Sequence, residues 1–201
     1  MSTTPPASQT VDAYLEQLAA KVPAPGGGAA AAITLAQAAA LAGMVIQYTL
    51  GKSKFAQHEA ANHARLADAT RIRTAALSLA HEDAVAYDIL NAMQRSGSAS
   101  ASELAVATAN AIKVPHDVMT LSALLLGALT EYPGATTTML ASDVRVAAIL
   151  ARAALQAARA NVEVNLASLP EPERASIRER LGLESLERTG EAAARAVESI
   201  C

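Results

Sequence analysis

Apolar residues along this chain recur with the three- and four-residue spacing of α-helices. The longest such segment covers residues 57–95, where the spaced apolar positions are Leu66, Ile72, Leu77, Val85, Ile89 and Met93. No segment alternates apolar and polar residues over the length of a strand, and no internal repeat is visible. The pattern therefore predicts an all-α protein.

Turn and capping residues divide the chain into six main predicted helices. These cover residues 11–21, 29–50, 57–95, 101–113, the segment from Pro115 to residue 131, and 142–169. Their expected ends are marked by Thr10 as an N-cap, Pro23 and Pro25, Gly51, residues 96–98, Pro115, residues 132–134, and Ser142 as an N-cap with Asp143 in the first turn. Pro115 is expected to interrupt or kink the path, because proline lacks the backbone N–H of a helix interior.

The ends of the chain carry weaker signals. Residues 1–10 are predicted to form a flexible arm, and residues 11–201 a single helical domain. After Pro170 we expect two short charged helices, divided near Gly182. The N-terminus has neither the positive region nor the apolar stretch of a signal peptide, which favours a cytoplasmic protein.

Residues 29–46 form an apolar run that approaches the length of a membrane span. Half of the run is alanine, which gains little on transfer to lipid, and Gln37 stands in its middle. A central helix buried inside the protein is therefore the preferred interpretation, and no membrane partner is expected.

Alanine dominates the composition, with 50 of the 201 residues. Alanine is the best helix former, and a core built from its small side chains fills only if the helix backbones approach closely. The composition favours long helices packed at short distance, often with a second subunit to complete the burial.

Charge and cysteine content exclude several classes of function. The chain has 16 basic and 19 acidic residues, a net charge of −3, which argues against a nucleic-acid partner. The single cysteine, Cys201, allows neither an internal disulfide nor a CxxC metal pair. The four histidines, at positions 58, 63, 81 and 116, lack metal-ligand spacing, so no metal site is expected.

The most distinctive motif is the turn that contains Gly26, Gly27 and Gly28, just before the second predicted helix. Glycines leave the backbone N–H groups at a helix N-terminus open, and these groups bind anions or polar heterocycles. Glycines also let two helices cross closely. On local grounds the two interpretations are about equally favoured.

Two lysines and two carboxylates are further candidates. Lys52 and Lys54 follow the second helix and could bind a carboxylate or transfer a proton, although lysines are also favourable at helix C-termini. Asp83 shares a helix face with Tyr87, whereas Asp88 is rotated about 140° from Asp83 on a regular helix. An acid in this apolar stretch needs either a salt-bridge partner or a functional role.

The sixth helix carries three polar candidates. Asp143 lies at its start, and Asn161 and Asn165 lie one turn apart near its end. Two asparagines in an alanine-rich helix either bind a ligand or bond another helix across an interface, and the local pattern favours the interface.

Six segments, taken together and in this order, resemble the formiminotransferase-cyclodeaminase family. They are PAPGGGAAAAI (23–33), TLGKSKF (49–55), DAVAYD (83–88), VP (114–115), ASDVRVAAIL (141–150) and NVEVNL (161–166). The resemblance extends from about residue 11 to residue 169. It implies an up-and-down bundle of long helices that forms a homodimer and acts on the one-carbon group of tetrahydrofolate.

The resemblance also implies a reaction and a set of site residues. A cyclodeaminase closes N5-formimino-tetrahydrofolate to the 5,10-methenyl form with loss of ammonia, and a cyclohydrolase opens the methenyl bridge with water. The absence of a formiminotransferase domain within these 201 residues modestly favours the cyclohydrolase. No cofactor is implied beyond tetrahydrofolate as the substrate. The implied catalytic residues are Asp83, Lys52 and Asp143, and the implied substrate-binding residues are Gly26, Gly27, Gly28, Lys54, Asp88, Asn161 and Asn165.

The chain departs from the family pattern at several positions near these motifs. They are Ser53, Phe55, Val85, residues 136–139 and Arg145. A diverged, non-catalytic dimer that binds folate or another anion is therefore the alternative function.

Overall fold

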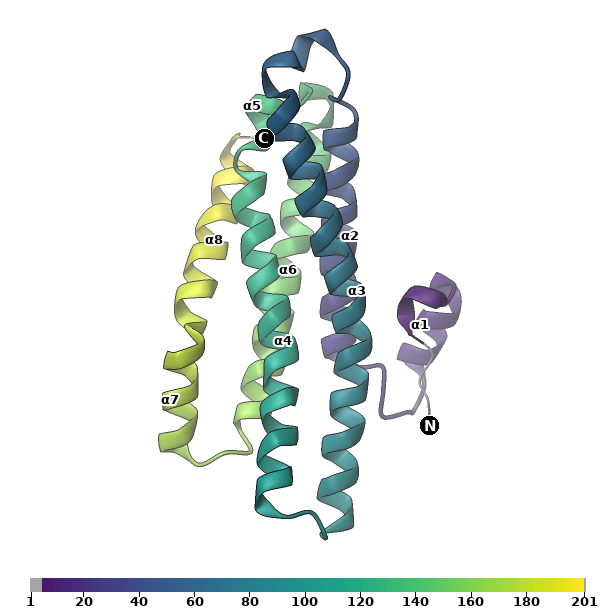
Figure 1. The fold of residues 1–201 in the computed structure, drawn as a ribbon, viewed down its shortest axis with the longest axis vertical. Coiled ribbons are helices and arrows are strands. Elements are labelled where there is room, and N and C mark those ends of the chain that lie inside the picture. The colour runs from purple at the N-terminus through teal and green to yellow at the C-terminus, as the bar shows by residue number, and fades with distance from the viewer. Residues whose placement is uncertain (1–4, 201) are drawn as a thin grey trace.

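The protein is an all-α, up-and-down bundle. The structure, a computed structural model, describes residues 5–200, apart from the side chain of residue 200. Four long helices form the bundle: α2 (Gly27–Gln47), α3 (Glu59–Ser96), α4 (Ala101–Leu129) and α6 (Ala141–Leu166). They run alternately up and down, and α3 and α4 extend beyond the others at one end (Figure 1). The predicted fold class is confirmed.

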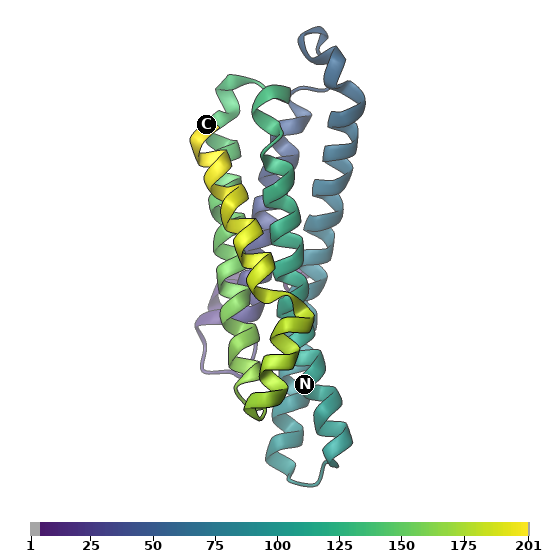
Figure 2. The ribbon, with the colours of Figure 1, turned by 90° about the vertical axis from the view of Figure 1, so that its left-hand side faces the viewer.

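Shorter elements surround the bundle. The helix α1 (Val11–Ala19) stands apart, beside α2 and α3, whereas α8 (Leu183–Ile200) lies along α4 and α6 (Figures 1 and 2). The remaining elements are α5 (Tyr132–Ala135), α7 (Glu171–Leu181) and three short 3-10 helices, η1 (Pro6–Ser8), η2 (Ser53–His58) and η3 (Thr138–Leu140). Residues 1–4 of the expected flexible arm lie outside the described part of the chain, and η1 packs against α3.

The helix α2 packs mainly against α3 and α6, and its alanines and glycines let these neighbours approach closely. Its buried face is made largely of alanines, together with Leu35, Val45 and Ile46. At Gly43, an added Cβ would stand 3.5 Å from the Leu66 side chain of α3. Both α2 and α4 are long and apolar enough to cross a membrane, but 61% and 56% of these spans are buried inside the bundle.

Most of the predicted helix ends are close to those observed. Thr10 caps α1, since its hydroxyl accepts a hydrogen bond from the Ala13 N–H at 3.2 Å. Gly97 and Gly182 end α3 and α7 in the left-handed conformation, at φ 62° and 61°. The predicted division of the tail near Gly182 is confirmed, but α8 is a long helix whose Leu183, Ala194 and Val197 are buried in the core.

Three local predictions are wrong. Pro115 does not divide this segment into two helices, since α4 is continuous from Ala101 to Leu129 with the proline inside it. Residues 132–135 form the single-turn helix α5 rather than a loop, and Tyr132 is buried. Ser142 is not an N-cap, because η3 leads directly into α6 and the helix already begins at Ala141.

Candidate active site

A cavity of about 270 Å³ lies where α2 begins and α6 approaches its end. The glycine turn forms one wall, and α3, α4 and α6 form the others. It is lined by Pro23, Ala24, Gly26, Gly27, Gly28, Asp83, Ala86, Tyr87, Ala111, Asn161, Val164 and Asn165. The fold thus brings together six of the predicted site residues: the three glycines, Asp83 and both asparagines.

The Asp83 carboxyl lies against the N-terminus of α2. The Ala29 backbone N–H donates a hydrogen bond to it, and a Cβ added to Gly28 would stand only 2.0 Å from Asp83 Oδ1. Gly28 therefore permits α3 to approach α2 closely, because any side chain at position 28 would collide with the Asp83 carboxyl. The close-crossing interpretation of the glycine motif is thus observed, and the crossing places the chain's own Asp83 at the start of α2. The ligand-binding interpretation stays a prediction.

Burial controls the protonation of Asp83. Desolvation raises the pKa of its carboxyl above the ordinary value, while the Ala29 N–H acts in the opposite direction. The net pKa is raised, so the loss of solvation outweighs the hydrogen bond from Ala29. A carboxyl group with a raised pKa holds a proton more readily than an exposed one, which suits the uptake and return of a proton.

Asn161 faces the same glycine turn from α6. Its Nδ2 donates to the Ala157 carbonyl oxygen at 2.8 Å, one turn back along the helix. Its Oδ1 lies 3.3 Å from the place where a Cβ of Gly27 would stand. The amide oxygen is thus held at the cavity wall, where it can accept a hydrogen bond from a bound heterocycle.

Asn165 bridges two helices. Its Nδ2 donates to the Ala111 carbonyl oxygen of α4 at 2.6 Å. Asn165 thus bonds another helix, as the interface interpretation predicts, but that helix belongs to the same chain and not to a second subunit. The residue still lines the cavity with the rest of its amide group.

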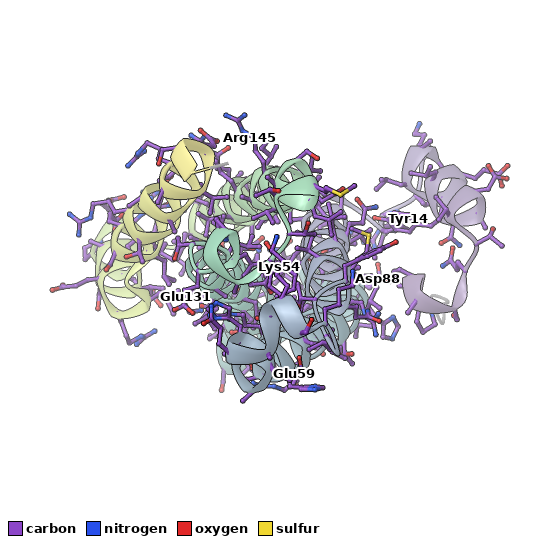
Figure 3. All side chains as sticks on the ribbon, turned by 90° about the horizontal axis from the view of Figure 1, so that it is seen from above. Tyr14, Lys54, Glu59, Asp88, Glu131 and Arg145 are labelled. Atoms are coloured by element: carbon purple, nitrogen blue, oxygen red, sulfur yellow. The ribbon has the colours of Figure 1, made fainter. Side chains whose placement is uncertain are left out.

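Tyr14 of α1 is a residue that the sequence analysis did not single out. Its Oη is buried and has no hydrogen-bond partner among residues 5–200. Burial raises the pKa of this phenol, and the negative charge of Asp83 raises it further. Its side chain points from α1 toward the bundle (Figure 3). Tyr14 could not be identified from the sequence, because no feature of the α1 sequence indicates that this helix packs near α3.

Four predicted site residues lie outside this cavity. Lys52, Lys54 and Asp143 are at the other end of the bundle, beyond the full length of α2, which spans about 30 Å. Lys52 and Lys54 are exposed and lie over the Tyr48 and Phe55 rings, at 5.7 and 5.5 Å. Asp88 is half-buried on another side of α3 and does not line the cavity.

The departures from the family pattern also lie away from the cavity. Val85 faces a separate groove between α3 and α4, and Arg145 is exposed in the first turns of α6. Ser53 and Phe55 belong to η2, at the far end of the bundle. Among residues 5–200, no group of three histidine, cysteine or acidic side chains is placed to hold a metal ion.

The fold and the cavity define an all-α bundle with a small cavity at which one largely desolvated acid, Asp83, lies. Comparisons with known proteins identify the family of this bundle. The family model for formiminotransferase-cyclodeaminase matches residues 10–181, which run from the N-cap of α1 to the end of α7. The chain belongs to the formiminotransferase-cyclodeaminase family.

Two relatives illustrate this membership. The chain is 30% identical over 183 residues to a methenyltetrahydrofolate cyclohydrolase of Methylorubrum extorquens, which covers 87% of this chain and 86% of that protein. It also superposes on the crystal structure of formiminotetrahydrofolate cyclodeaminase from Thermotoga maritima with a TM-score of 0.89, at 26% identity and over 96% of each chain.

Proposed function

We propose that this protein is a folate one-carbon enzyme that opens the methenyl bridge of 5,10-methenyltetrahydrofolate with water. The similarity to a methenyltetrahydrofolate cyclohydrolase over most of both chains supports this reaction. The structural similarity to a formiminotetrahydrofolate cyclodeaminase supports a ring closure at the same carbon, which is the reverse type of step. The observation that carries the proposal is the Asp83 carboxyl, whose pKa is raised at the wall of the cavity.

The chemistry requires a group that takes up a proton and returns it. Water adds to the methenyl carbon, and Asp83 as a carboxylate accepts a proton from that water. The bond from this carbon to N5 then breaks and N5 takes a proton, which leaves a formyl group on N10 and releases one proton overall. In a cyclodeaminase the same acid would protonate the departing ammonia as N10 closes the ring.

The remaining cavity residues provide binding rather than proton transfer. The open N–H groups at the start of α2 and the Oδ1 of Asn161 form a donor and acceptor set for the pterin ring. These groups sit on helices that are fixed by core packing, which is the arrangement that holds a substrate near its reactive geometry.

Absorption spectroscopy tests the reaction directly. Purified protein should accelerate the loss of the methenyltetrahydrofolate chromophore, and Asp83→Asn should abolish most of this acceleration. Circular dichroism of both proteins serves as the folding control. If the folded protein accelerates neither this loss nor the appearance of the chromophore from the formimino form, the enzymatic proposal is wrong, and calorimetry with tetrahydrofolate then distinguishes a non-catalytic binder.

We further propose a homodimer through α6. The exposed residues Val146, Ile149, Ala153, Ala157 and Ala160 recur at steps of three and four and form one stripe along the helix. Two such stripes packed antiparallel would set Val146 against Ala160, Ile149 against Ala157, and Ala153 against itself. Each large side chain then meets a small one, as in well-packed helix pairs.

The antiparallel pairing would bring the distant predicted residues toward the cavity. The partner subunit's Asp143 would lie level with Asn161 and Asn165, and its Lys52 would come to the same end of the bundle. Lys52→Ala should then lower activity with little change in the free energy of unfolding. A mixture of Lys52→Ala and Asp83→Asn subunits should recover about a quarter of the activity, because half of the dimers are mixed and each has one intact site. A monomer in sedimentation, or no recovery on mixing, would contradict this arrangement.

A further inference from the structure

A second, smaller cavity of about 150 Å³ continues the active-site cavity along α3 and α6. The two cavities share the lining residues Tyr87, Val164 and Asn165. The additional lining residues are Leu90, Asn91, Gln94 and Ser168. We refer to this second cavity as the arm groove.

The arm groove follows the face of α3 that carries Asp83. Tyr87, Asn91 and Gln94 succeed Asp83 at steps of four, four and three, so they lie on one face of the helix. Along the helix axis, Asn91 is about 12 Å and Gln94 about 16 Å beyond Asp83. A ligand whose reactive end lies at Asp83 can therefore extend along this face only if it carries a long, narrow substituent.

The junction of the two cavities is formed by an apolar pair, Tyr87 of α3 and Val164 of α6. Tyr87 is 47% exposed and Val164 is 72% exposed, and both line both cavities. An exposed aromatic ring opposite an aliphatic side chain suits a flat aryl group, because stacking gains dispersion and removes apolar surface from water.

The far part of the arm groove offers hydrogen-bond donors. The amides of Asn91 and Gln94 form no hydrogen bond with another residue of the described chain, 5–200. Ser168 donates its hydroxyl proton to the Asn165 carbonyl oxygen at 2.8 Å. None of the side chains that line this groove is charged, so an anionic group bound here by this chain is held by neutral donors.

We infer that the arm groove binds the p-aminobenzoyl-glutamate arm of the folate, an assignment that rests on the proposed function. The benzoyl ring lies between Tyr87 and Val164, and the glutamate carboxylates accept hydrogen bonds from Asn91 and Gln94. The order of groups along the groove matches the order in the ligand, from the reactive one-carbon group through the aryl ring to the amino acid.

A competing location is the groove of about 530 Å³ between α3 and α4, which contains Lys113. That groove shares only Ala86 with the active-site cavity and faces another side of α3. The charge of Lys113 is already paired with Asp117, one turn along α4. Both observations favour the arm groove for the glutamate.

Calorimetry with two ligands tests the assignment without relying on turnover. Tetrahydropteroate has the pterin and the benzoyl group but no glutamate, so the ratio of its Kd to that of tetrahydrofolate measures the glutamate contribution. We expect wild-type protein to bind tetrahydrofolate more tightly, by about tenfold or more, since hydrogen bonds to charged groups contribute at that level. The double variant Asn91→Ala/Gln94→Ala should weaken tetrahydrofolate binding by a similar factor and leave tetrahydropteroate binding unchanged.

Two further variants complete the test. Tyr87→Ala should weaken the binding of both ligands, because both carry the aryl ring, and Tyr87→Phe should restore it. Asn110→Ala, an exposed amide in the groove between α3 and α4, is the matched control and should change neither Kd. Equal Kd values of the two ligands for wild-type protein, or an unchanged ratio in the double variant, would overturn the arm-groove assignment. Retained discrimination without turnover would instead contradict only the proposed reaction.

Discussion

Asn165 of α6 donates its side-chain N–H to the backbone carbonyl oxygen of Ala111 in α4, at 2.6 Å. In a regular helix this carbonyl would accept from the backbone N–H of residue 115, but residue 115 is a proline and has none. The side chain of one helix therefore supplies the donor that the other helix lacks. This explains how α4 continues through Pro115, and it links two motifs that are 50 residues apart in the sequence.

This relationship predicts a coupled pair of substitutions. Asn165→Ala should cost about 1–3 kcal/mol of unfolding free energy, because it leaves the Ala111 carbonyl without a donor near the core. In the Pro115→Ala background, the new N–H of residue 115 can bond Ala111, so the same Asn165→Ala change should cost clearly less. Urea unfolding of the four proteins measures the coupling. Strictly additive effects would show that the side chain does not substitute for the missing backbone donor.

Asp83→Asn should separate stability from activity. In the folded protein the pKa of Asp83 is raised above the value of 3.8 that applies to the exposed side chain. Between these two pKa values the folded state binds more protons than the unfolded state, so the wild-type protein loses stability as the pH rises through them. The variant lacks this loss and should be more stable than wild type at pH 7, with the difference shrinking below pH 3.8.

The activity of the same variant should fall by about 10²- to 10⁴-fold, the usual contribution of a positioned acid–base group. Thermal unfolding measured across the pH range, together with the chromophore assay, gives both quantities. A variant that is less stable than wild type at neutral pH would mean that the charge interaction with the start of α2 outweighs the desolvation of Asp83.

The glycine turn offers a matched pair of substitutions. Gly28→Ala would place a Cβ 2.0 Å from Asp83 Oδ1, so it should cost about 1–3 kcal/mol, as overpacking does, and should displace the acid from the cavity. Gly26→Ala meets no atom within 4 Å, and its φ of −133° is accessible to alanine. It should change the unfolding free energy by no more than about 0.5 kcal/mol. Urea unfolding of both variants provides the comparison, and similar losses of unfolding free energy would argue against a close approach at Gly28. The chromophore assay of Gly28→Ala then reports the displacement of Asp83.

Tyr14→Phe should stabilise the protein. The Tyr14 hydroxyl is buried and finds no partner among the described residues, and such a group costs about 1–3 kcal/mol. Its removal leaves the ring packing intact, so the urea midpoint should rise. Tyr48→Phe is the control, since Tyr48 is 54% exposed and its hydroxyl can bond water. A lower midpoint for Tyr14→Phe would indicate that the hydroxyl is hydrogen-bonded in solution.

The prediction of the helices succeeded where local signals are strong. The Thr10 cap and the left-handed Gly97 and Gly182 depend on neighbouring residues only, so the sequence is enough to find them. The predictions of a helix break at Pro115 and of an N-cap at Ser142 failed because each rested on the residue type alone, without its neighbours in the fold. A partner on α6 compensates the proline, and a preceding 3-10 turn extends the helix past the serine.

The candidate site divides in the same way. The sequence by itself determined which residue types are available: open glycines before an alanine-rich helix, an acid in an apolar stretch, and two asparagines one turn apart. Only the tertiary structure decided which of them meet, because Gly28, Asp83 and Asn161 lie on three helices and come together through packing between helices. Lys52 and Asp143 have equally suitable chemistry, but within one chain the rigid length of α2 and α6 keeps them at the far end of the bundle.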